Sequence, residues 1–275
     1  MPPRFLVLSG LLLVCLTNTA NAEVFTFAGR EIALDPPQGW CRLEESRPAE
    51  ADKIALQRKI HGTANHLVMV YTPCDELAAL RAGQRAEIGL LGGITIIQQD
   101  GAIRPAPGLS RASFLDQLVR SIPGLDINSV MQASRERALG PDARGPAYAV
   151  PVVRQDEFAA YLGSSAKIAV GDGREIVLNA VNAVTLLNGL PVGMSIAALG
   201  DISLDTLFAQ QQRNAATLVA ANLAYEPGWF GRLMGATGWM SAVRGALIGV
   251  IIALLCTIGM MGQKWWRARQ AAGEK

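Results

Sequence analysis

Apolar and polar residues alternate at the start of the region after residue 22, and this pattern predicts two short strands at 23–27 and 31–34. The turn Ala28-Gly29-Arg30 joins them. Further strands are predicted where short apolar runs lie between turn residues, at 66–71, 94–97, 147–153, 157–162, 167–170, 176–187 and 190–199. The last two are joined by Asn188-Gly189, a strong signal for a two-residue hairpin turn.

Other segments repeat their apolar residues at the spacing of a helix. One helix is predicted to begin at Pro48 and to bury three residues: Ile54, Leu56 and Ile60. Shorter helices are predicted at 75–81, 111–121 and 127–138, and Ser110 caps the second of these. The longest runs from Leu204 to about Tyr225 after a cap at Asp201 or Ser203. It is predicted to turn residues 210–213 outward and to bury Leu207, Phe208, Leu218, Val219 and Leu223.

Together these elements predict an α+β domain, in which a mainly antiparallel sheet buries one face against helices. Its opening segment resembles PsbP/Mog1-like α/β/α sandwich domains. The resemblance covers about the first twenty residues after the predicted cleavage site, with a late hairpin and a final long helix, and its residues are Phe27, Ile32, Leu34, Pro36, Pro37 and Trp40. It implies a fold class and carries no function.

Residues 1–22 have the composition of a secretory signal peptide. Arg4 is followed by an apolar run from Phe5 to Leu16, and Ala20-Asn21-Ala22 matches a cleavage site. Cleavage is therefore predicted before Glu23. The alternatives are an uncleaved anchor, which the polar residues after the apolar run disfavour, and a lipid anchor at Cys15, which the bulky residue before that cysteine disfavours.

A second apolar run, from Gly245 to Gly262, holds eighteen residues without a charge, and basic and aromatic residues follow it. We interpret it as a membrane-spanning helix at 242–263, preceded by a linker at 226–241 and followed by a cytoplasmic tail at 264–275. The tail carries Lys264, Arg267, Arg269 and Lys275, as expected for a cytoplasmic flank. The exported domain is then 23–225, and a bacterial inner membrane with the domain in the periplasm is the simplest host. A eukaryotic secretory membrane is the alternative.

Small residues recur every four positions along this run, at Ser241, Gly245, Gly249, Ala253 and Thr257. Such a row allows two helix backbones to approach closely. The predicted partners are therefore membrane lipid and either a second copy of this helix or a helix of another membrane protein. The alternative is that the row only reflects how common glycine is in membrane helices.

Four cysteines reduce to two in the predicted exported domain, because Cys15 lies in the signal peptide and Cys256 in the apolar run. Cys41 and Cys74 are predicted to form a disulfide, which is stable in an oxidising compartment. The bond would stabilise the domain by roughly 3 kcal/mol in the chain-entropy model. Two free buried thiols or a metal pair are the alternatives, and the metal pair is weak because the histidines, His61 and His66, show no ligand spacing.

Charge excludes one class of partner. Between residues 23 and 241 there are 19 Lys and Arg against 22 Asp and Glu, without a basic stripe, so nucleic acid is not expected to bind.

No motif predicts a catalytic, cofactor or metal site. Gly163-Ser164-Ser165 and Gly193-Met194-Ser195 lack the second glycine of a nucleophile elbow. Cys74 beside Asp75 could be a thiolate at a helix start, but half of a disulfide is the simpler interpretation. Three carboxylates could act as an acid and base, or could be ordinary loop residues: Asp100, Asp156 and Glu157.

Two function classes remain. The first is a non-catalytic module, tethered to the membrane, that acts as a scaffold, a subunit or an envelope-associated interaction domain. The second is a membrane-anchored hydrolase whose site is assembled only by the fold. Missing motifs and the scarcity of histidine favour the first class.

Overall fold

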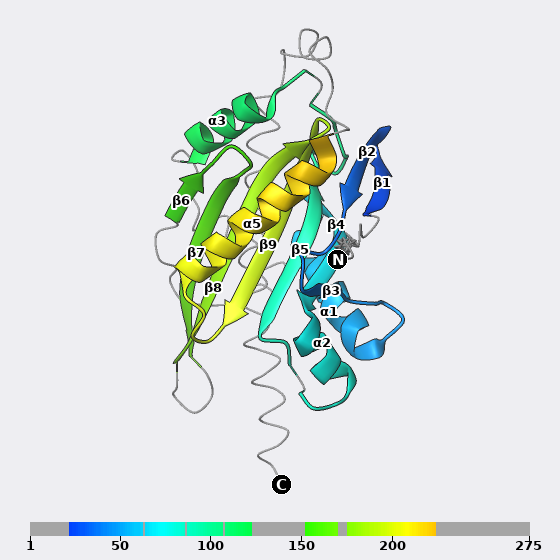
Figure 1. Cartoon of the computed structure of the whole chain (residues 1–275), viewed down its shortest axis with the longest axis vertical. Helices are drawn as coiled ribbons and strands as arrows, with labels where there is room; N and C mark the ends of the chain where they lie inside the picture. Colours follow the sequence, from blue (N-terminus) through cyan, green and yellow to red (C-terminus); the bar gives the residue numbers. More distant parts are fainter. Residues whose placement is uncertain are drawn as a thin grey trace, which may run out of the picture.

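The computed structural model describes residues 22–62, 64–85, 87–106, 108–122, 152–169 and 175–223 (Figure 1). These residues form an α+β domain, as predicted, in which antiparallel strands pack with helices. In chain order the elements are β1 (Glu23–Phe27), β2 (Arg30–Leu34), β3 (Trp40–Arg42), α1 (Pro48–His61), β4 (Asn65–Pro73), α2 (Cys74–Arg81), β5 (Leu90–Ile97), α3 (Arg111–Ser121), β6 (Val152–Gln155), β7 (Ala160–Ala169), β8 (Glu175–Leu187), β9 (Leu190–Leu199) and α5 (Leu204–Asn222).

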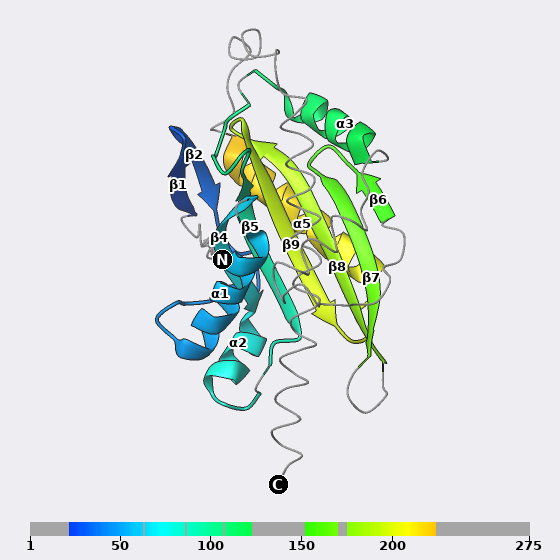
Figure 2. The ribbon, with the colours of Figure 1, turned by 180° about the vertical axis from the view of Figure 1, so that it is seen from behind.

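One seven-stranded sheet organises the domain, with the strand order β3-β4-β5-β9-β8-β7-β6. All of its pairings are antiparallel, and β6 to β9 pair with one another in chain order. The β1–β2 hairpin is a separate two-stranded sheet. Helices cover both faces of the large sheet (Figures 1 and 2): α5 lies on the face that also meets β1–β2, whereas α1, α2 and α3 lie on the opposite face.

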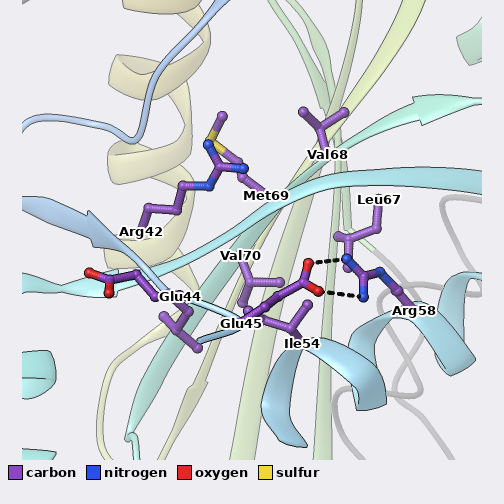
Figure 3. A pocket seen from close by; sticks show the side chains of 10 residues that line it. Arg42, Glu44, Glu45, Ile54, Arg58, Leu67, Val68, Met69 and Val70 are labelled. Carbon is purple, nitrogen blue, oxygen red and sulfur yellow. Dashed lines mark hydrogen bonds and ion pairs between the residues drawn. The ribbon is translucent and has the colours of Figure 1, made fainter. Parts of the chain in front are cut away.

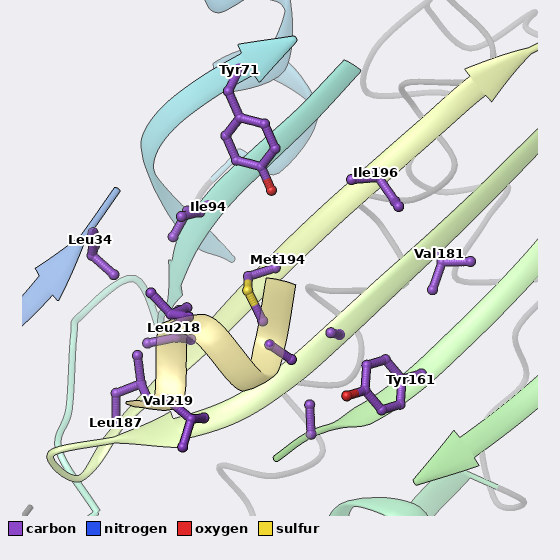
Figure 4. Packing of buried hydrophobic residues seen from close by; sticks show 14 of the residues in the cluster. Leu34, Tyr71, Ile94, Tyr161, Val181, Leu187, Met194, Ile196, Leu218 and Val219 are labelled. Atoms are coloured by element: carbon purple, nitrogen blue, oxygen red, sulfur yellow. The ribbon is translucent and has the colours of Figure 1, made fainter. Parts of the chain in front are cut away.

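The core is divided between these faces because side chains alternate along each strand. On the α5 face, Val181 of β8, Met194 of β9 and Leu218 of α5 belong to one cluster of buried side chains (Figure 4). On the opposite face, Leu178 and Val184 of β8 pack with α3. A smaller cluster of Leu43, Ile54, Val70, Leu77, Ile88 and Leu91 lies under α1 and α2. Both faces of the central strands are therefore buried.

The hairpin of β8 and β9 is confirmed at the residues where the sequence predicts it. Asn188 and Gly189 have φ angles of 46° and 77°, the left-handed values that a two-residue turn of this kind requires. Pairing extends without a shift from Leu187 opposite Leu190 to Leu178 opposite Leu199. The β8–β9 and β7–β8 ladders each contain ten residue pairs, and β5 pairs with the other side of β9.

Two aromatic rings lie directly on bare backbone in the α5-side core. A Cβ at Gly92 of β5 would lie 2.1 Å from the Tyr71 ring, and a Cβ at Gly163 of β7 would lie 2.5 Å from the Phe208 ring. A side chain at either glycine would displace a fully buried ring. Gly163 therefore serves packing within a strand and is not part of a catalytic turn.

Asn222, the last residue of α5, holds β2 against the sheet. Its amide oxygen accepts a hydrogen bond from Ala33 N, and its amide nitrogen donates to Ala33 O, both at 2.8 Å. The nitrogen also donates to Leu218 O at 2.8 Å. Asn222 is fully buried, so these bonds satisfy backbone groups of β2 that water does not reach.

The predicted disulfide is confirmed. Cys41 and Cys74 are bonded, with a Cα–Cα distance of 4.8 Å and a sequence separation of 33. The bond joins β3 to the first residue of α2, next to the pairing of Cys41 with Thr72. In the chain-entropy model a loop of this length contributes about 3–4 kcal/mol to stability.

The structure corrects several details of the prediction. Residues 160–169 are one strand, although the sequence predicted two strands with 163–166 between them. Of the residues predicted to be buried, Leu223 is 58% exposed and Leu56 is half-buried. Gln211, predicted to point outward, is fully buried. Position 211 lies in the sheet-facing stripe of α5, four residues from Leu207 and Ala215, and geometry places it there regardless of polarity.

Within the described ranges, no helix is long and apolar enough to cross a membrane. The predicted signal peptide cleavage region, the helix at 127–138, the linker at 226–241, the membrane helix at 242–263 and the tail at 264–275 lie outside these ranges, apart from Ala22.

Replacing Asn222 by alanine is expected to lower the free energy of unfolding by about 3 kcal/mol, because two buried backbone groups of Ala33 lose their partner. Urea unfolding of the full-length protein, followed by circular dichroism, measures this change. Asn188→Gly is the matched control, since it removes an exposed hydrogen bond to Glu31 O while keeping the turn. Equal losses in the two variants would contradict the role of Asn222.

Candidate functional site

The candidate site is a hollow of about 410 Å³ at the β4 edge of the sheet. It is lined by the end of β3 and the loop after it, by one side of α1 and by the middle of β4 (Figure 3). Its lining residues are Arg42, Leu43, Glu44, Glu45, Ile54, Arg58, Leu67, Val68, Met69 and Val70. We refer to it below as the β4 hollow.

The hollow exists because β3 is much shorter than β4. β3 pairs with β4 only at Tyr71, Thr72 and Pro73, and Leu43 N then donates a last hydrogen bond to Val70 O at 2.9 Å. After Leu43 the chain turns away toward α1. Within the described part of the chain, no strand pairs with the outer edge of β4 at Leu67 and Val68.

A β-bulge in β4 changes which face of the sheet its side chains point to inside the hollow. Leu67 pairs with Thr95 and Met69 pairs with Ile94, so Val68 is an extra residue without a counterpart in β5. As a result Val68 and Met69 both pack on the α5-side cluster, whereas Leu67 and Val70 pack on the cluster under α1. The edge therefore presents apolar side chains toward both faces of the sheet.

Ion pairs surround the apolar part of the hollow. Arg58 of α1 binds both carboxylate oxygens of Glu45 (Figure 3). Arg42 Nη1 donates to Glu23 Oε2 at 2.7 Å, which ties β1 to the end of β3. Arg81 of α2, which does not line the hollow itself, donates to Glu44 at 2.9 Å. Acidic and basic groups are balanced, so the hollow has no strong preference for a charged ligand.

These pairs keep the carboxylates ionised. The hydrogen bond from Arg58 lowers the pKa of Glu45, and the hydrogen bond from Arg47 lowers the pKa of Glu44. Burial alone would raise the pKa of Glu50, but the hydrogen bond and charge of Arg81 outweigh it and lower the value. A general acid needs the opposite shift, toward neutrality near pH 7.

The β1–β2 hairpin forms a second wall beside the β4 edge. The Phe27 ring meets the His66 ring edge-on at 5.6 Å, and Phe25 stacks on Phe27 at 6.1 Å. Both phenylalanines are only half-buried. The edge of β4 thus lies between α1 on one face and an aromatic surface on the other.

The structure gives structural roles to three other residues that the sequence raised as candidates, Cys74, Asp156 and Asp100, whereas Glu157 is exposed. Cys74 is held in the disulfide and is not a thiolate. Asp156 accepts hydrogen bonds from the backbone of Phe158 and Ala159 and from the Tyr161 hydroxyl, so it caps the turn before β7. Asp100 lies in a tight turn with a φ angle of 51°.

The two serine-containing segments, at 163–165 and 193–195, do not have the geometry of a nucleophile elbow. Ser164 and Ser195 are in the middle of β7 and β9, and neither stands at a turn from a strand to a helix. Among the described residues no group of three or more His, Cys, Asp and Glu side chains could hold a metal ion. The small-residue row Ser241, Gly245, Gly249, Ala253 and Thr257 lies outside the described residues.

Sequence reasoning missed the β4 hollow. Its only local signal is the mixture of Arg42, Glu44 and Glu45 between a strand and a helix, which is common in loops. The rest of the lining comes from α1 and β4, and those residues meet only in the folded chain.

Comparisons with known proteins return no matching family model and no similar curated protein. The resemblance of the first segment to PsbP/Mog1-like domains therefore gains no support from them.

One buried histidine predicts how stability depends on pH. His61 is 1% exposed, its Nδ1 lies 3.5 Å from the Asn65 amide, and burial lowers its pKa to about 4. An unfolded histidine takes up a proton near pH 6.5, so the folded state binds fewer protons between these values. The contribution that neutral His61 makes to the free energy of unfolding is fully present above pH 6.5 and is lost as the pH falls toward 4.

We expect this loss to reach about 3 kcal/mol in the unaltered protein and to disappear from its pH profile in His61→Leu. Urea unfolding at a series of pH values measures both. A variant that loses stability over the same window as the unaltered protein would show that other groups cause the effect.

Proposed function

We propose that this chain is an exported protein, anchored in a membrane by one C-terminal helix, whose domain binds a partner protein at the β4 hollow without catalysing a reaction. Three observations support the export and the anchor: the signal-like residues 1–22, the uncharged run at 245–262 and the basic residues after it. The Cys41–Cys74 disulfide is consistent with an oxidising compartment such as the periplasm.

The observation that carries the binding role is the chemistry of the hollow itself. Its floor is apolar, its rim consists of paired charges, and a strand edge runs through it. This combination of an apolar centre and a polar rim is typical of protein–protein contacts.

A hydrolase would use the same hollow differently. It would need a nucleophile beside a base, or a carboxyl group that stays protonated near neutral pH. The hollow is lined by arginine, glutamate and aliphatic residues, and the pKa values of Glu44 and Glu45 are shifted downward. These groups can orient a partner, but they are poorly suited to proton transfer.

The membrane helix would add a second contact. The row of small residues from Ser241 to Thr257 would let it pack against another helix, either in a second copy of this chain or in a different membrane protein. Binding at the hollow and packing in the membrane are then separate contacts on opposite sides of the linker at 226–241.

The proposed topology predicts opposite results for two fusions. A reporter enzyme that is active only outside the cytoplasm should work when fused after Tyr225 and should fail after Lys275, since the helix at 242–263 returns the chain to the cytoplasm. Deleting residues 2–22 should abolish the activity of the first fusion. Activity of the Lys275 fusion would overturn the orientation.

Binding at the hollow predicts a position-specific crosslink. A photo-crosslinking amino acid in place of Val68, in the full-length protein in its native membrane, should join a distinct protein. The same amino acid in place of Thr217, an exposed residue of α5, should not. Identical products from both positions, or no protein product from position 68, would overturn the proposal.

A further inference from the structure

We infer that the β4 hollow receives an extended peptide segment of a partner protein, which pairs with the outer edge of β4 as an added strand. This inference rests on the proposed function and specifies how the partner protein binds at the hollow. The partner is recognised by its backbone as well as by its side chains, and the segment adopts no helix when bound.

The edge begins where β3 stops. Leu43 N to Val70 O is the last hydrogen bond between the chain around β3 and β4, and the chain then departs as Glu44 N turns to the carboxylate of Glu50. From that point toward the start of β4, a strand position next to Leu67 and Val68 is open in the described structure. An added segment would continue the sheet beyond β3, in the place that β3 would occupy if it were longer.

Side chains on both sides of the edge fit an extended segment. Alternate residues of a strand point to opposite faces of a sheet. One set would meet Ile54 and Leu67 on the α1 side, and the other would meet Val68 and Met69. Both sets therefore favour apolar residues at the centre of the peptide, and the bulge at Val68 enlarges the apolar surface on the second side.

The charged rim of the hollow can open at little cost to admit the segment. Arg58 and Glu45 are 53% and 60% exposed in their side chains, so their ion pair is a surface pair that contributes little to stability and can open when a peptide arrives. Once released, Arg58 and Glu45 can bind opposite charges on the peptide. A segment with an apolar centre and polar or charged ends is the predicted ligand.

The walls of the hollow favour a single strand over a second copy of the domain. The edge lies between α1 on one face and the β1–β2 hairpin, with Phe27 against His66, on the other. A lone extended segment brings no helix or hairpin of its own to this edge, whereas a second domain would bring its own α1 and hairpin against it. The opposite edge of the sheet differs, because all four residues of β6 are exposed there.

The test begins with random-sequence peptides displayed on phage and selected on the full-length protein in lipid nanodiscs. Selected peptides are synthesised and their affinities measured for two variants. Val68→Lys places a flexible charge at the edge of β4, and binding should fall at least about tenfold. Val152→Lys places the same charge on β6, where the valine is 40% exposed, and binding should be unchanged.

A scan of the peptide backbone then separates strand addition from other docking modes, and it uses the unaltered protein, so it does not depend on how Val68→Lys folds. Methylating one backbone nitrogen at a time removes single N–H donors. In an added strand only alternate residues donate to β4, so methylation should weaken binding about tenfold at every second position and be tolerated between them.

Each outcome decides a different point. Peptides that depend on Val68 and show the alternation support strand addition. Peptides that depend on Val68 without alternation overturn strand addition, while binding at the hollow stands. If none of the selected peptides depends on Val68 for binding, the proposal that the hollow is a binding site is overturned. Self-association of the protein in sedimentation, abolished by Val68→Lys, would make a second copy the occupant and overturn the inference.

Discussion

Burial of both faces of the β8–β9 hairpin is the constraint on which the rest of the fold depends. A sheet with two covered faces needs apolar residues at successive positions, and β9 meets this need with buried residues at eight of its ten positions. α5 requires the odd-numbered face of β8, and α3 requires the even-numbered face. Losing the register of this hairpin by one residue would exchange the two sets of side chains and expose both helices' contact surfaces.

Several buried polar side chains of this double-sided core donate to backbone carbonyls near the ends of strands. Thr185 of β8 donates to Phe158 O in the turn before β7, and Asn179 donates to Ile202 O before α5. Thr72 donates to Leu90 O and ties β4 to the start of β5. Each bond satisfies a partly buried carbonyl at a position where the chain enters or leaves the sheet.

Local patterns identified most of the fold. The helix at 111–121 and the hairpin at 176–199 were predicted closely, because Ser110 and Asn188-Gly189 give strong local signals for a cap and a turn. β3 was missed because it is three residues long and is held by pairing and a disulfide, neither of which has a periodicity. β7 was divided because Gly163-Ser164-Ser165 is typical of turns, whereas the glycine is needed under the Phe208 ring. The β4 hollow could not be predicted, since it depends on where β3 ends beside β4.

The bonds between Asn222 and Ala33 join residues 189 positions apart and so affect the order in which the domain is completed. The β1–β2 hairpin is made early during synthesis, but the side chain that satisfies its inner edge is made 189 residues after Ala33. Until α5 arrives, β2 exposes unpaired backbone to its surroundings and remains open to pairing with the wrong strand. If the chain is exported as it is made, its N-terminal hairpin would need to stay unpaired, or be shielded by another protein, until α5 has crossed the membrane.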